Sequence, residues 1–170
     1  MVGFNRETDA ARLDYQLLMR GPVRLIHGRT LLSTTVEWLR RHDYEVLTID
    51  AAWLITPHMF RDLGSAFGYA CHDNWQCLGE GIDEALAEVW RRTACFALVL
   101  TSFDVFERDH RDDAHTLLEV VAERAWPAAL LGRRLVCLVQ SDRLSLNLRR
   151  IGMWSVPWFD QQQGSVIARS

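Results

Sequence analysis

Four short stretches of the sequence are almost continuously apolar. They cover residues Val23–Ile26, Tyr44–Ile49, Phe96–Leu100 and Leu135–Val139. A strand with one exposed face alternates apolar and polar residues, whereas a strand covered on both faces does not. The pattern therefore predicts four strands buried inside a sheet.

Helical patterns separate these apolar stretches. Thr34 and Glu37 have capping-box spacing, which predicts a helix that opens there and runs through Arg41. Thr56 followed by Pro57 predicts the start of a second helix. Further helices are expected within residues 1–20, over 75–90 and over 113–125, the last one capped by Asp112 or Asp113.

Strands that alternate with helices are typical of an α/β domain with a mainly parallel sheet. The chain has 170 residues, of which 49% are apolar and 24% charged, a composition that fits one folded domain. We therefore expect a single α/β domain, its small, mainly parallel sheet flanked by helices. Residues 141–170 are expected to be irregular, with Trp154, Trp158 and Phe159 packed back on the core.

Charge is distributed unevenly along the chain. Residues 56–130 carry 13 acidic and 6 basic side chains, a balance of −7, whereas residues 131–170 have a balance of +4. Such an acidic segment disfavours direct binding to nucleic acid and favours a basic protein surface. No apolar run is long enough for a membrane span or a signal peptide, so we expect a cytoplasmic protein that does not bind membranes.

Motifs of enzymes are mostly missing from the sequence. It has no G-x-S-x-G, Walker or H-E-x-x-H motif, and the four cysteines fit reduced core residues better than a disulfide framework. The six histidines show no metal-ligand spacing, so neither a metal nor a cofactor is expected. Cys71 beside His72 leaves one alternative open, a small enzyme that uses this thiol, the histidine or a carboxylate.

A stripe of polar residues runs along one face of the helix predicted over residues 75–90. Gln76, Glu80 and Glu84 follow at intervals of four, with Asp83 beside them, and apolar residues take the other face. Such a stripe is by itself typical of a solvated helix face. Glycines at 79 and 81 each cost about 1 kcal/mol in a helix interior. They flank Glu80 with bare backbone, as if something approaches it closely.

At these residues the chain resembles the barstar-like family of inhibitors of barnase-type ribonucleases. Asn74, Trp75 and Leu78 match the family's motif, and Glu80 stands for its key acidic residue. Residues 97–100, 103–107 and 117–123 look similar to the family's strand, aromatic turn and last helix. The resemblance covers residues 44–140, which leaves residues 1–43, with a helix, a strand and a helix, and residues 141–170 as extensions.

The resemblance implies a non-catalytic inhibitor or immunity protein. In this hypothesis Glu80 takes the place of an RNA phosphate in the basic active site of a ribonuclease or another basic toxin. Glu123 falls where the family has a second inhibitory Glu, and Tyr69 is a substitute for the family's loop Tyr. The expected partner-binding residues are Glu80, Gln76, Glu84, Asp83, Asp73, Tyr69 and Glu123.

Several positions depart from the family's pattern. Gln76 replaces an Asp, Ala70 a Tyr, His72 a Gly and Gly79 a Trp. These departures favour an alternative, a barstar-fold binding or immunity module for a different toxin or regulatory partner. The sequence leaves the oligomeric state open.

Overall fold

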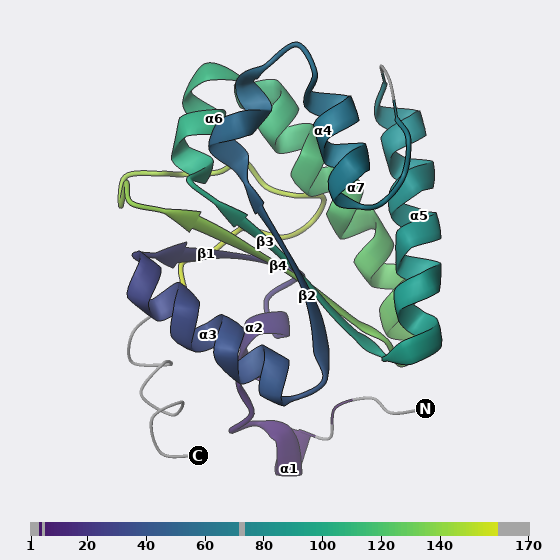
Figure 1. Cartoon of the computed structure of the whole chain (residues 1–170). Helices are drawn as coiled ribbons and strands as arrows, with labels where there is room; N and C mark the ends of the chain where they lie inside the picture. The colour runs from purple at the N-terminus through teal and green to yellow at the C-terminus, as the bar shows by residue number, and fades with distance from the viewer. Residues whose placement is uncertain (1–3, 5, 72–73, 160–170) are drawn as a thin grey trace.

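The computed structural model describes residues 4, 6–71 and 74–159, and its centre is a four-stranded parallel sheet (Figure 1). The strands lie in the order β1-β4-β3-β2. Each predicted strand is confirmed with slightly wider bounds, as is the small parallel sheet of an α/β fold. The strands are β1 (Val23–His27), β2 (Tyr44–Asp50), β3 (Cys95–Thr101) and β4 (Arg134–Ser141).

Continuous apolar sequence in the two central strands fills both faces of the sheet. In β3, Phe96, Leu98 and Leu100 belong to one buried cluster. The intervening Cys95, Ala97 and Val99 belong to a second. Since successive side chains of a strand point to opposite faces, the sheet needs a helical layer on each side.

The helices form those two layers (Figure 1). One face of the sheet is covered by α2 (Leu13–Leu18) and α3 (Arg29–Arg41), with the short α1 (Arg6–Asp9) at the N-terminal end. The other face is covered by four helices that come from the two crossovers β2–β3 and β3–β4. They are α4 (Met59–Ala66), α5 (Trp75–Arg92), α6 (Phe103–Asp109) and α7 (Arg111–Leu130).

The predicted start of α3 is wrong. The helix begins at Arg29, directly after Gly28, whose φ of 76° is easily reached only by glycine. Thr34 lies inside the helix, where its hydroxyl donates to the carbonyl oxygen of Thr30. Its spacing to Glu37 therefore mimics a capping box without forming one.

Two other helix starts also differ from the prediction. Thr56 ends the 3-10 helix η1 (Ala51–Ile55), and α4 starts at Met59. Neither Asp112 nor Asp113 caps α7, which begins at Arg111 and carries both aspartates in its first turn. These acids still interact favourably with the positive end of the helix dipole.

The N-terminal helical pattern divides into α1 and α2 instead of one helix. Leu13 and Leu17 are buried under the sheet. Asp14, 1% exposed, accepts hydrogen bonds from Arg12, from the Tyr44 hydroxyl of β2 and from Arg134 of β4. This one carboxylate ties the N-terminal segment to two strands.

The chain after β4 packs partly as expected. Phe159 is 3% exposed, and Trp158 pairs with Leu25 of β1 in a parallel bridge. The amide of Leu25 donates to Pro157 and that of Phe159 donates to Leu25, so residues 157–159 cover the open edge of β1. Trp154, in contrast, is 44% exposed.

Among the helices of the described residues, none combines the length and apolarity that crossing a membrane requires.

Candidate functional site

Helix α5 presents the polar stripe expected from the sequence. The Asn74 side chain accepts a hydrogen bond from the Cys77 amide at 2.8 Å, so Asn74 caps the helix. The opposite face of α5 packs on the core through Leu78, Ile82, Leu86 and Val89. This packing fixes which face of α5 meets solvent.

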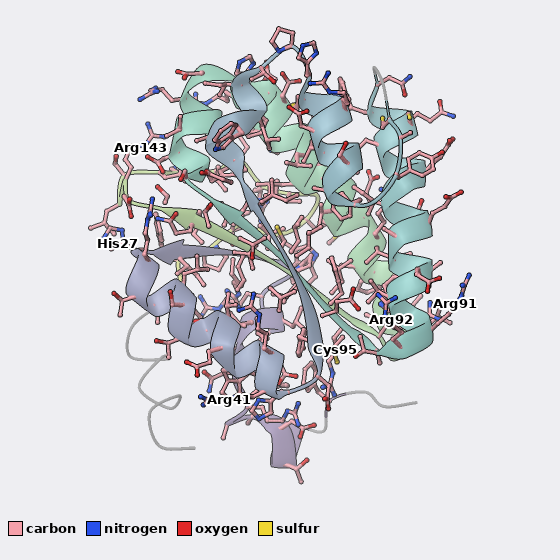
Figure 2. All side chains as sticks on the ribbon, viewed as in Figure 1. His27, Arg41, Arg91, Arg92, Cys95 and Arg143 are labelled. Carbon is pink, nitrogen blue, oxygen red and sulfur yellow. The ribbon has the colours of Figure 1, made fainter. Side chains whose placement is uncertain are left out.

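The exposed face of α5 brings three of the expected residues together. Gln76, Glu80 and Glu84 are all exposed, and the Gln76 amide donates to the Glu80 carboxylate at 3.1 Å. Figure 2 shows Arg91 and Arg92 at the far end of the same helix, about 16 Å from Glu80 by helical rise. Both arginines are held there by Glu88, and Arg92 also by Glu45.

The two glycines of α5 make room for side chains of the chain itself. A Cβ at Gly79 would lie 2.5 Å from Nη2 of Arg124, and one at Gly81 would lie 2.4 Å from Cδ1 of Tyr69. Both glycines therefore let distant side chains of the same molecule approach the helix backbone.

Tyr69 thereby becomes part of the α5 surface. Its ring rests against Gly81, next in sequence to Glu80. The charge of Glu84 is the largest cause that raises the pKa of the Tyr69 phenol, followed by desolvation and then by Cys77 and Glu80. The phenol therefore stays protonated beside two carboxylates, and its hydroxyl is available as a hydrogen-bond donor.

Asp83 and Glu123 lie to one side of this surface, in the hollow between α5 and α7. The Arg124 guanidinium forms an ion pair with Asp83, with 2.8 Å between Nε and Oδ1. Glu123 lines the same hollow and is exposed. Arg124 was missed by sequence reasoning, because nothing in the sequence relates it to a helix about forty residues earlier.

Ion pairing distinguishes Glu80, Glu84 and Glu123 from most of the other acids of the described residues. Within the described part of the chain, no arginine or histidine pairs with Glu80, Glu84 or Glu123. Acids that pair with arginine occur on α2, α3, β2, α4, α6 and α7 and also elsewhere on α5: Asp14, Glu37, Glu45, Asp62, Asp83, Glu88, Glu107, Asp109 and Asp112. The carboxylates of Glu80 and Glu84 thus face solvent, where a partner can reach them.

Of the remaining candidates, Asp73 and His72 lie outside the described residues. Cys71 is fully buried, and its thiol lies 3.7 Å from the carbonyl oxygen of Asn74, so it is not presented to a substrate in solution. All four cysteines are free. Among the described residues, no three His, Cys, Asp or Glu side chains form a group able to hold a metal ion.

Parallel α/β sheets commonly bind ligands at the carboxyl ends of their strands. At that edge Gly28 alone connects β1 to α3, and Nδ1 of His27 lies 3.2 Å from the carbonyl oxygen of Ser141. A connection of one residue is too short to wrap around a phosphate group. The connection between β1 and α3 is therefore not a phosphate-binding loop.

Comparison with known proteins assigns no family to the chain. No protein-family model matches it, and no curated protein matches it. Among solved structures, the chain is similar to a Walker-type ATPase of Pyrococcus abyssi, with 14% sequence identity and a TM-score of 0.47. The match covers 98% of this chain and 57% of the ATPase chain, so the chain spans little more than half of that protein's length. This similarity is too low to support any statement about function.

Because the two glycines have different neighbours, we expect their replacement by alanine to change stability by different amounts. In Gly79→Ala, only the end of the flexible Arg124 side chain has to move, and the gain in helix propensity offsets the loss of an exposed ion pair. We expect its free energy of unfolding to stay within about 1 kcal/mol of wild type. In Gly81→Ala, the base of the Tyr69 ring has to move, and we expect a loss of about 1–2 kcal/mol.

Urea denaturation of the two variants and the wild type measures this difference. A Gly81→Ala variant as stable as Gly79→Ala would contradict the packing of Tyr69 on the helix.

Proposed function

We propose that the protein is a non-catalytic inhibitor that acts in the cytoplasm and blocks the basic active site of a ribonuclease with the exposed face of α5. The observation that carries the proposal is that Glu80 and Glu84 have no arginine partner among the described residues, where more than half of the other acids form an ion pair with arginine. Because these carboxylates form no such ion pair, none has to be broken before they bind a cationic site.

The arrangement of the face supports binding by complementarity of charge and shape. Glu80 and Glu84 lie one turn apart on α5, and Tyr69, whose ring packs on Gly81, adds an aromatic surface with a hydroxyl donor near both. Aromatic residues surrounded by polar groups are frequent centres of protein interfaces. The balance of −7 over residues 56–130 adds long-range attraction to a basic partner.

The resemblance to the barstar-like family is a second support. The elements named in the resemblance follow one another in the chain, namely the strand β3, the aromatic segment that forms α6 and the helix α7. Glu80 occupies the position of the family's key acid, on the exposed face of α5. Glu123, at the position of the second inhibitory acid, is exposed at the neighbouring hollow.

One observation favours a second candidate function, a binding module for a different basic toxin or regulatory partner. Where the family has a tryptophan, Gly79 admits Arg124, which places a positive charge beside the acidic face and neutralises Asp83. A partner that carries an acidic residue next to its basic site fits this pattern better than a uniformly basic active site.

Stopped-flow association with a barnase-type ribonuclease tests the proposal through its electrostatics. We expect the association rate constant to fall about tenfold or more as ionic strength rises from about 0.01 to 0.5 M, because salt screens the attraction between the two surfaces. The dissociation rate constant is expected to change much less. Binding with a salt-independent association rate would contradict the acidic face as the docking surface, and a folded chain that does not bind would leave the second candidate.

A further inference from the structure

A cavity of about 350 Å³ opens at the amino-terminal edge of the sheet, at the opposite end of the strands from His27. Its walls come from α7, from α2, from the Gly21–Pro22 segment before β1 and from the start of β4. The volume is in the range of pockets that hold small molecules. None of the residues proposed to bind the ribonuclease lines it, so the inference does not depend on the proposed function.

The cavity exists because the surrounding elements carry small residues where larger ones would fill it. Helix α7 contributes Ala122, Ala125 and Ala129 to the wall. Gly21, with a φ of 107°, lets the Trp154 ring approach to 3.0 Å of where a Cβ would stand. Trp154 and Trp126 frame the opening and are 44% and 65% exposed, which is unusual for side chains this large and apolar.

Two arginines, Arg133 and Arg134, line this otherwise apolar cavity. The Arg133 guanidinium lies over the Trp90 ring at 4.5 Å and pairs with no carboxylate in the described part of the chain. Arg134 shares Asp14 with Arg12, so two guanidinium groups share a single buried carboxylate. The cavity therefore combines an apolar lining with two arginines in its wall, one of which has no carboxylate partner among the described residues.

We propose that this cavity binds a small amphipathic anion, namely an apolar chain or ring that carries a carboxylate. The apolar part fills the space between α7 and Pro22, where burial removes it from water. The carboxylate pairs with Arg133, whose planar guanidinium offers two parallel donors. Trp126 and Trp154 cover the ligand at the opening.

Isothermal titration of the full chain with dodecanoate tests the proposal, with dodecanol as the uncharged counterpart of the same length. In Ala129→Trp, a large side chain fills the cavity from an exposed position of α7, so folding is not challenged. Arg133→Gln removes the charge and keeps the apolar walls. Ala87→Trp, at an exposed position of α5, is the control for adding a tryptophan to the surface.

We expect one dodecanoate to bind per chain, with an affinity reduced at least about tenfold by Ala129→Trp and by Arg133→Gln and unchanged by Ala87→Trp. Dodecanol is expected to bind more weakly than dodecanoate and to be insensitive to Arg133→Gln. A wild-type chain that does not bind dodecanoate, or dodecanoate binding that survives Ala129→Trp, would overturn the proposal. Equal affinity for dodecanol would also overturn it and would assign the cavity to an uncharged group, such as an apolar side chain of a partner.

Discussion

Replacing both Glu80 and Glu84 by glutamine is expected to weaken binding to the ribonuclease by at least about a hundredfold, because each carboxylate meets cationic groups that would otherwise be left buried and unpaired. Both side chains are exposed and pair with no arginine or histidine among the described residues, so the fold does not depend on their charge. The melting temperature of Glu80→Gln/Glu84→Gln is therefore expected to stay within about 2 °C of wild type.

A second double variant with the same net charge distinguishes the effect of local contacts on affinity from the effect of overall charge. Glu37→Gln/Asp112→Asn also removes two negative charges, at exposed carboxylates that pair with Arg41 and Arg149 away from α5. We expect its affinity for the ribonuclease, measured by titration calorimetry, to change less than about fivefold. Equal losses in the two double variants would mean that only net charge matters, which would contradict a defined site on α5.

Asp14→Asn is expected to destabilise the protein by about 3 kcal/mol, which corresponds to a melting temperature lower by about 6–12 °C. The Asp14 carboxylate is buried and accepts hydrogen bonds from Arg12, Arg134 and Tyr44. An amide at this position leaves two guanidinium groups without a counter-charge. Asp112→Asn, which breaks an exposed pair with Arg149, is the control and is expected to cost less than about 1 kcal/mol.

The difference in stability between wild type and Asp14→Asn is expected to depend on pH. Burial raises the pKa of Asp14, but the hydrogen bond and charge of Arg12 and the charge of Arg134 outweigh it and hold the pKa below its ordinary value of 3.8. Because this group loses its proton more easily in the folded protein, its stabilisation is fully present above its ordinary pKa. It is lost as the pH falls through the lower pKa of the folded state.

Thermal denaturation of the two proteins between pH 3 and pH 7 measures this effect. The gap between their melting temperatures should be constant near neutral pH and should narrow below about pH 4. A constant gap across the whole range would contradict the ionised carboxylate as the source of stability.

The strands were predictable from sequence because a strand that is buried on both faces has a continuous run of apolar residues. Val136 and Leu138 pack on one side of β4 and Leu135 and Cys137 on the other, so an uninterrupted apolar run identifies the strand. Helix starts were less predictable, since they depend on backbone angles. Gly28 starts α3 with a positive φ and no side-chain cap, whereas Thr34 has the residue type of a cap inside the helix.

The candidate site was predictable only to the level of one helix. The interval of four between Gln76, Glu80 and Glu84 follows from helical geometry, and the structure places all three on the exposed face. What surrounds them was not predictable, because Arg124 and Tyr69 reach Gly79 and Gly81 from other elements. Tertiary contacts of this kind determine whether an acid is paired with an arginine, as Asp83 is, or left free for a partner.

Titration of a barnase-type ribonuclease with this protein, followed by the rate of RNA cleavage, tests most directly whether the α5 face blocks the enzyme. The account predicts a linear fall in cleavage that reaches zero at one chain per enzyme, and no such fall with Glu80→Gln/Glu84→Gln. Full cleavage in the presence of an excess of the folded wild-type chain would contradict the proposed function.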